Sequence, residues 1–189
     1  KSLDVIEKKK DDVTFSTGVS INNLTLNEND IGDFRTFLKL SPPLRTEEDR
    51  VGLIKGINKN LINVIVSDHK PEDEESKRLT FSQAATGASG IETLLALSLE
   101  LFHNESIKLP KLISLLSCNP ARILKIDKGN LSIGNDADFC IVDIYKPWIV
   151  KKEKLISKSK NTSIENKKLQ GVVMNTFVKG QELFKYNKS

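Results

Sequence analysis

Apolar residues follow two different spacings along this chain, and each spacing predicts a different kind of element. Within residues 81–106, leucines recur every three or four positions after Ser89, a candidate helix cap, and Glu92, three residues further on. This arrangement is typical of a capped amphipathic helix. Residues 61–67, LINVIVS, are instead apolar at nearly every position. Such a run predicts a parallel strand that is covered on both faces.

Helices and extended segments alternate along the rest of the first two thirds of the chain. Apolar periodicity predicts helices, with Thr46 as a cap in one case and Asn119 followed by Pro120 in another. Enrichment in β-branched and aromatic residues predicts extended segments. The helices are expected at residues 3–10, 45–60, 109–117 and 119–126, and the extended segments at residues 11–21 and 33–41. This alternation predicts an α/β fold built as a parallel sheet or barrel.

The pattern of the chain changes near Lys128. Two stretches, residues 129–150 and 169–184, contain short β-type runs separated by Gly, Asn, Asp and Pro. Turn-rich spacing of this kind is typical of a small β module. We therefore expect a barrel portion at residues 1–127 and a β module at residues 128–189.

The charge balance argues against a nucleic-acid partner. The chain has 29 basic and 25 acidic residues and a formal net charge of +4, which gives only a weak long-range field. Its lysine-rich runs, residues 8–10 and 151–168, lack the interleaved aromatic residues that stack on bases. We expect these runs to form a solvated surface.

The cysteines and the hydropathy pattern predict the compartment. Cys118 and Cys140 are too far apart for a CxxC site and too few for a disulfide framework, so we expect both as small core residues in a reducing compartment. No apolar run approaches the about 20 residues that a membrane span needs. We therefore expect a cytoplasmic protein without a membrane partner. Because the chain starts at Lys1 and its sole methionine is Met174, we also expect it to be the tail of a longer protein.

A carboxylate and an imidazole, those of Asp68 and His69, directly follow the apolar run of residues 61–67. In a parallel barrel the strand ends and the loops after them form the reactive face, so this position makes Asp68 a candidate metal ligand or base. In the alternative interpretation, Asp68 caps the loop and His69 packs against the rim of the barrel. The dipeptide by itself leaves both interpretations open.

Four longer blocks carry a family resemblance. In chain order they are FLKLSPPLRTEEDR, VIVSDHKPEDEESKRLTFSQAATGASGIETLL, LLSCNPARILKIDKGNLSIGNDADFCIVD and SKSKNT. Together they resemble the C-terminal half of dihydroorotases, which are part of the cyclic amidohydrolase superfamily. The resemblance implies the C-terminal part of a (β/α)8 TIM-type barrel with part of a small β-sandwich module. It also implies that the missing N-terminal half completes the barrel and that the protein forms homo-oligomers.

The resemblance implies a metal-dependent role for Asp68. In dihydroorotases the aspartate at this position binds zinc and serves as the base on the metal-activated water, so Asp68 is expected to do both. A single carboxylate does not hold a catalytic zinc. The other ligands of the zinc cofactor are therefore expected outside this chain.

The resemblance also implies substrate contacts at Ser41, Glu72, Thr86 and Gly87, where the chain departs in part from the family pattern. The family has Asn at the position of Ser41, His at that of Glu72 and Phe at that of Thr86, whereas Gly87 is retained. The histidine helps to hold a carboxylate of the substrate. A glutamate in its place sets one negative charge beside another, which disfavours binding.

Two functions fit these residues. The first is a hydrolase of the dihydroorotase type in pyrimidine biosynthesis, which interconverts the small molecules dihydroorotate and carbamoyl aspartate. The second is a non-catalytic dihydroorotase-like scaffold that partners aspartate carbamoyltransferase. The second is favoured by Ser41, by Glu72 and by Asn22 and Asn23, which replace a tandem histidine of the family with side chains that do not titrate near neutral pH. A nucleic-acid binder has only the lysine runs in its support.

Overall fold

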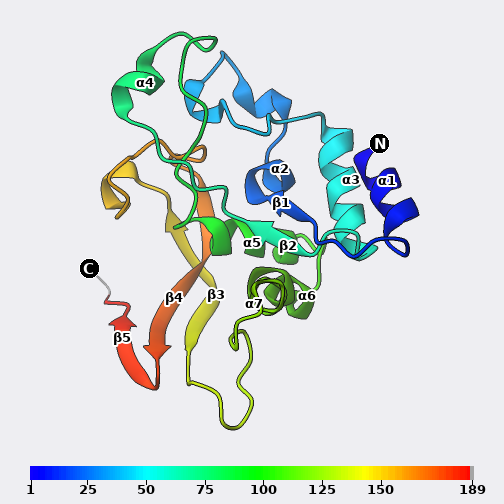
Figure 1. Cartoon of the computed structure of the whole chain (residues 1–189). Coiled ribbons are helices and arrows are strands. Elements are labelled where there is room, and N and C mark those ends of the chain that lie inside the picture. The colour runs from blue at the N-terminus through cyan, green and yellow to red at the C-terminus, as the bar shows by residue number, and fades with distance from the viewer. Residues whose placement is uncertain (188–189) are drawn as a thin grey trace.

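The computed structural model describes residues 1–187 of the chain and shows an α/β fold, as predicted (Figure 1). The helices are α1 (Ser2–Lys9), α2 (Ile21–Thr25), α3 (Glu47–Asn58), α4 (Glu74–Arg78), α5 (Leu94–His103), α6 (Leu109–Ile113) and α7 (Asn119–Leu124). The strands are β1 (Gly18–Ser20), β2 (Val64–Val66), β3 (Phe139–Ile149), β4 (Lys168–Val178) and β5 (Gln181–Lys185). Short 3-10 helices span Glu28–Ile31, Thr36–Leu38 and Lys152–Lys154, and a π-helical turn spans Ser114–Cys118. Within residues 1–187, no helix is both long enough and apolar enough to cross a membrane.

The parallel strands of the first part of the chain meet at one edge. β1 pairs in parallel with β2, with Ser20 opposite Val66. A third parallel segment is marked by Ala88, which pairs with His69 just beyond β2. Because parallel strands end at the same edge of a sheet, the polar residues that follow β1 and β2 are brought to one side.

The apolar run that contains β2 is only partly covered. Ile65 is buried, but the neighbouring Val66 is 43% exposed. Successive side chains of a strand point to opposite faces, so one face of β2 packs against the core and the other is open. The predicted cover on both faces is therefore not provided by the described part of the chain.

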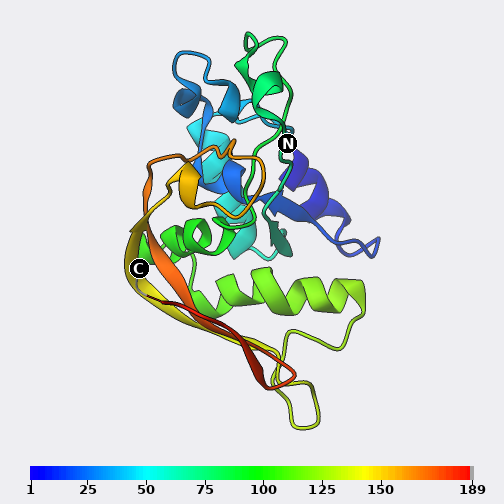
Figure 2. The same ribbon diagram turned by 90° about the vertical axis from the view of Figure 1, so that its left-hand side faces the viewer.

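The antiparallel sheet of β3, β4 and β5 forms the β module. Along β3 the side chains alternate, so that Ile144 and Trp148 pack against the core whereas Tyr145 and Ile149 are exposed. In Figure 2 the yellow and orange strands β3 and β4 run as a long curved ribbon along one side of the molecule. The helix α5 lies against β4.

One hydrophobic core joins the β module to the parallel strands. Its buried members include Ile65 from β2, Leu99 from α5 and Leu169 from β4. Within the β module, Trp148 of β3 packs against this core and donates its indole N–H to the Gly171 carbonyl of β4 at 3.1 Å. The shared core therefore holds the β module in place next to the strand ends.

The extended segment predicted at residues 33–41 is wrong. Thr36–Leu38 form a 3-10 helix, in which Leu38 N–H donates to the Arg35 carbonyl and Lys39 N–H donates to the Thr36 carbonyl, each at 3.0 Å. An extended segment needs a neighbouring strand for its backbone groups. Here the N–H groups of Leu38 and Lys39 pair locally instead.

The caps predicted at Ser89 and Asn119 are also wrong. The helix α5 begins only at Leu94, and the Ser89 hydroxyl donates to the Ser159 carbonyl at 3.2 Å. Asn119 has helical backbone angles and lies inside one continuous helix made of α6, the π turn and α7, where two separate helices were predicted. Because Pro120 has no N–H to donate, the hydrogen-bond pattern before it widens to a π turn without ending the helix.

Candidate active site at the strand ends

Asp68 lies at the carboxyl edge of the parallel strands, just beyond β2. Its backbone is left-handed, with a φ of 49°, a conformation that aspartate and asparagine adopt more readily than most residues. Its side chain is partly buried. The strand end therefore places a carboxylate at the edge where the reactive face of a barrel is expected.

His69 anchors the neighbouring parallel segment. Its ring nitrogen Nδ1 accepts hydrogen bonds from the backbone N–H groups of Gly90 and Ile91, at 3.2 and 3.3 Å. A nitrogen that accepts hydrogen bonds carries no proton, so the proton of the neutral ring is on Nε2. These bonds agree with a structural role for His69 at the rim of the barrel, because its Nδ1 is engaged within the chain.

The predicted substrate contacts on the third parallel segment are tightly packed. Gly87 is buried beside the partly buried Thr86, has a φ of 145°, and donates its N–H to the Lys39 carbonyl at 2.9 Å. A Cβ added at Gly87 would lie 2.5 Å from the Lys70 carbonyl oxygen. Ser41 is exposed, two residues beyond Lys39. Hydrogen bonding therefore brings the segments that carry Gly87 and Ser41 together.

Asn22 and Asn23 follow β1 at the same edge. β1 and β2 are in register, so Asn22 and Asp68 each lie two residues beyond the last pair of the ladder. Asn22 is only 2% exposed, and its Oδ1 accepts a hydrogen bond from Ser163 Oγ at 2.9 Å. The Nδ2–H of Asn23 donates a hydrogen bond to the Pro43 carbonyl at 3.2 Å. Both amides therefore make contacts within the chain.

One segment, to which the residue pattern assigns no role, contacts this edge of the sheet. We call residues 157–164 the strap; they lie in the connection between β3 and β4, drawn in yellow to orange in Figures 1 and 2. Asn161, Thr162 and Ser163 are 3%, 0% and 6% exposed. Polar residues are buried in this way only where the fold satisfies their hydrogen bonds. The SKSKNT block was a signal of the family, but its residue types do not reveal what it contacts.

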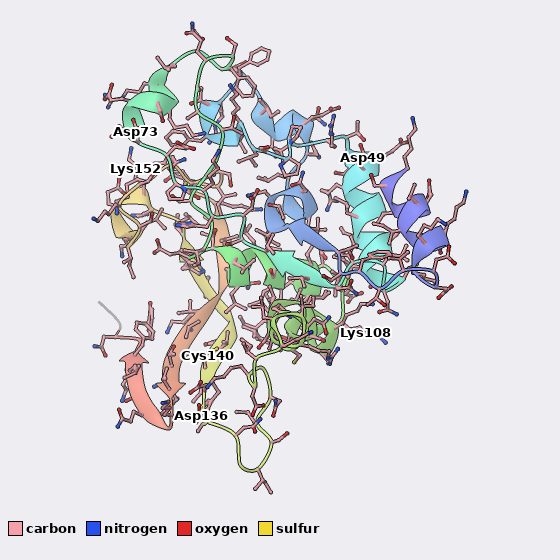
Figure 3. The ribbon with its side chains drawn as sticks, viewed as in Figure 1. Asp49, Asp73, Lys108, Asp136, Cys140 and Lys152 are labelled. Atoms are coloured by element: carbon pink, nitrogen blue, oxygen red, sulfur yellow. The ribbon has the colours of Figure 1, made fainter. Side chains whose placement is uncertain are left out.

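A pocket of about 790 Å³ lies between the strap and the loop after β2. Glu72 lines it from the loop, and Ser159 and Asn161 line it from the strap. Figure 3 shows Asp73 and Lys152, which also line the pocket, on the same side of the molecule. The other predicted site residues in the described part of the chain, Asp68, Ser41, Thr86 and Gly87, do not line it.

Glu72 contributes a negative charge to the wall of this pocket. Its side chain is 23% exposed, and its carboxylate lies 3.6 Å from Lys70 Nζ. Its backbone N–H donates to Asn161 Oδ1 at 3.3 Å. The Glu72 carboxylate therefore lies at the pocket, with the ammonium group of Lys70 beside it.

The described residues do not form a metal site by themselves. Within residues 1–187, no three or more His, Cys, Asp or Glu side chains are grouped so that they could hold a metal ion. By the register of β1 and β2, Asn22 and Asp68 follow their strands at equivalent positions, and the amides of Asn22 and Asn23 bind other parts of the chain. A catalytic zinc needs about three protein ligands. The predicted zinc therefore does not fit the residues of this part of the chain alone.

A buried lysine connects the loops around the site. Lys77 is 2% exposed, and its Nζ donates to the carbonyls of Thr36 and Ala85 at 3.1 and 2.7 Å. Burial away from water disfavours the charged ammonium group and lowers the pKa of Lys77 to about 8, although the negative charge of Glu72 opposes this effect. The ammonium group is therefore a cation of reduced basicity inside the fold.

We expect Lys77 to make the free energy of unfolding rise as the pH increases from about 8 to about 10.5. In this range the unfolded chain still binds the proton that the folded protein has released, so raising the pH favours the folded state. Lys77→Met should flatten this part of the profile. Urea unfolding at several pH values measures the effect.

The matched control for this prediction is Lys39→Met. Lys39 also donates to two backbone carbonyls, those of Ser82 and Ala84 at 2.8 and 2.7 Å, so the control removes a similar pair of hydrogen bonds. It should retain most of the rise in stability above pH 8, because burial, and not the positive charge of Lys39, is the main cause of the lowered pKa of Lys77. An equal rise in the Lys77→Met protein would contradict the assignment to Lys77.

These features define the class of protein. Parallel strands with polar residues at one carboxyl edge, joined by a common core to an antiparallel β module, are part of a (β/α)8 barrel with an attached module. Residues 3–183 match the amidohydrolase family. This chain therefore belongs to the amidohydrolase family.

Solved structures confirm the predicted fold. The L-hydantoinase (dihydropyrimidinase) from Arthrobacter aurescens matches with a TM-score of 0.91 at 24% identity, over 98% of this chain and 43% of its own. The dihydropyrimidinase from Brevibacillus agri NCHU1002 matches with a TM-score of 0.88 at 19% identity, over 97% of this chain and 42% of its own. At these identities the likeness establishes the fold.

The resemblance to dihydroorotases is also confirmed. The dihydroorotase of Ehrlichia canis (strain Jake) is 38% identical over 97% of this chain and 41% of its own length. The dihydroorotase of Aquifex aeolicus (strain VF5) is 37% identical over 97% of this chain and 44% of its own length. The chain therefore spans about two fifths of the length of these relatives.

Proposed function

We propose that the chain is part of a cyclic amidohydrolase that interconverts dihydroorotate and carbamoyl aspartate. The observation that carries this proposal is the carboxylate of Asp68 at the end of β2, in a chain of the amidohydrolase family with dihydroorotases among its relatives. The chain spans about two fifths of those relatives, so the activity is proposed for a complete barrel. The N-terminal half of the same barrel would supply the remaining strands.

Asp68 is proposed as the base of this reaction. Hydrolysis of a cyclic amide requires that water lose a proton as it attacks the carbonyl carbon and that the departing nitrogen gain one. A carboxylate oxygen of Asp68 would accept the first proton and pass it to the nitrogen. Ser41 and the backbone groups of Thr86 and Gly87 are proposed to contact the substrate.

Zinc is proposed as the cofactor, with Asp68 as one ligand. The geometry of residues 1–187 does not complete a zinc site, so the remaining ligands would come from the segment that completes the barrel. This N-terminal half of the barrel is also the partner that we propose for residues 1–187. Assembly of the complete protein into homo-oligomers is a further proposal.

The direct test is an assay of the complete protein for conversion of dihydroorotate to carbamoyl aspartate, together with its zinc content. Turnover is the result that we expect. Bound zinc without turnover of dihydroorotate would contradict this substrate and indicate another cyclic amide. The absence of both zinc and turnover would contradict the enzyme proposal.

Glu72→His should lower KM for dihydroorotate in the complete protein by about fivefold. Removing a negative charge near the substrate carboxylate is worth about 1 kcal/mol in a well-hydrated site, and about 1.4 kcal/mol corresponds to tenfold. Steady-state kinetics measures the change. Glu74→Gln is the control, because Glu74 lines the same pocket but pairs with Arg78 at 2.8 Å, and it should leave KM unchanged. An unchanged KM for Glu72→His would show that Glu72 does not face the substrate carboxylate.

A second candidate function is a non-catalytic scaffold that partners aspartate carbamoyltransferase. The observation in its favour is the use of Asn22 and Asn23, at the strand-end edge, for contacts within the chain. A scaffold needs the fold but not the metal. Zinc at about one equivalent or more in the complete protein would contradict this alternative.

A further inference from the structure

We propose that Asn161, in the strap, is a positioning residue for the candidate active site. Its side chain is 3% exposed and bridges two segments that carry predicted substrate contacts. This inference rests on the proposed function, because it concerns how Glu72 and Gly87 are presented to a substrate. It also makes the β module part of the site, since the strap is the connection between β3 and β4.

The two ends of the Asn161 amide bind different segments. Its Nδ2 donates to the Gly87 carbonyl at 3.1 Å, and its Oδ1 accepts from Glu72 N–H at 3.3 Å. These partners fix the orientation of the amide, because a carbonyl only accepts and an N–H only donates. One side chain therefore sets the separation between the loop after β2 and the third parallel segment.

Further hydrogen bonds hold Asn161 itself in place. Ser89 N–H donates to the Asn161 carbonyl at 3.0 Å, and the Ser89 hydroxyl, which donates to the Ser159 carbonyl, lies 3.4 Å from Asn161 Oδ1. The hydroxyl of Ser159 lies against both Asn161 Oδ1 and the Glu72 carbonyl, and it donates its single proton to one of these two acceptors. Hydrogen bonds strengthen one another inside a protein, where water does not compete. The strap, the loop and the third segment are thus joined in one network.

This network extends to the wall of the pocket. Asn161 and Glu72 both line it, so a change in the separation of the two segments changes the position of the Glu72 charge. Gly87 has little room to move in compensation, because its backbone packs closely on that of Lys70. Asn161 is therefore placed to control substrate binding more than the proton transfer assigned to Asp68.

Amide hydrogen exchange tests the contact directly. Asn161→Ala should speed exchange at the Glu72 amide about fivefold, since removing one hydrogen bond costs about 1 kcal/mol. Asn161→Asp should preserve protection there, because a carboxylate oxygen still accepts from Glu72 N–H although it cannot donate to the Gly87 carbonyl. Ser163→Ala is the matched control: it removes another buried hydrogen bond of the strap, the one to Asn22, and should leave the Glu72 amide unchanged.

Kinetics of the complete enzyme separates positioning from general support of the fold. Asn161→Ala should raise KM for dihydroorotate about tenfold with a smaller change in kcat, because the binding segments move and Asp68 does not. A residue that only supports folding would reduce the amount of active enzyme and leave KM unchanged. Asn161→Gln keeps an uncharged amide but displaces it by one methylene, so it should also raise KM, and it serves if the alanine variant does not fold.

Two results would overturn the inference. One is normal protection of the Glu72 amide in folded Asn161→Ala protein; the other is an unchanged KM in the variants despite altered exchange. If the wild-type enzyme itself shows no turnover of dihydroorotate, the proposed function fails. In that case exchange at the Glu72 amide decides whether Asn161 positions the loop.

Discussion

Replacing Asp68 by asparagine is expected to lower the rate of dihydroorotate ring opening in the complete protein by at least about 100-fold. An amide cannot accept the proton that the proposed mechanism transfers to the carboxylate. The fold should stay intact, because the side chain is only partly buried and asparagine adopts the left-handed φ of 49° as readily as aspartate does. Loss of activity with an unchanged fold would therefore come from the chemistry.

Initial rates and urea unfolding of the same preparations measure the two parts of this prediction. The matched control is Asp33→Asn, which removes an exposed carboxylate far along the chain from β2 and should change neither quantity. The free energy of unfolding of the Asp68→Asn protein should stay within about 0.5 kcal/mol of wild type. An undiminished rate would remove Asp68 from the mechanism, and a grossly unfolded variant would give it a structural role instead.

Gly87→Ala is expected to cause the largest loss of stability among single substitutions at the candidate site. The glycine has a φ of 145°, and an added Cβ would lie 2.5 Å from the Lys70 carbonyl oxygen. Backbone strain and overpacking cost about 1–3 kcal/mol each, so a loss of roughly 3 kcal/mol or more is expected. The obstacle is backbone, which cannot rotate away as a side chain can.

Gly52→Ala is the matched control for this substitution. Gly52 lies inside α3, and nothing lies within 4 Å of an added Cβ. Alanine there should stabilise the protein by up to about 1 kcal/mol, because glycine is the poorer helix former. Urea unfolding of both variants measures the contrast. Equal stability of Gly87→Ala and wild type would mean that the close approach between Gly87 and Lys70 is not rigid.

Elements with strong local signals were predicted well. The helix predicted at 45–60 is α3, and the side chain of its predicted cap, Thr46, accepts a hydrogen bond from Asp49 N–H at 3.2 Å. The helix predicted at 3–10 is α1. The apolar run at 61–67 contains β2, which pairs in parallel with β1 as predicted for a parallel strand. Caps and apolar periodicity act within a few residues, so one stretch of sequence contains the whole signal.

The errors fall where distant contacts outweigh local preference. Ser89 has the spacing of a cap, but its hydroxyl binds the strap, and α5 therefore begins at Leu94. Residues 33–41 have the composition of a strand, yet Thr36 binds the Lys77 carbonyl at 2.5 Å and the segment turns. A serine or threonine hydroxyl can satisfy either arrangement. The choice between them was made by residues far away in the chain.

The sequence by itself determined the alternation of helices and strands, the family and the delivery of Asp68 to the end of an apolar strand. Only the tertiary structure decided what surrounds that carboxylate. The bond from Ser163 to Asn22 joins residues 141 positions apart, and the bond from Glu72 to Asn161 joins residues 89 positions apart. Hydrogen bonds across such separations leave no periodic pattern in one sequence, because they depend on which chain segments the common core brings into contact.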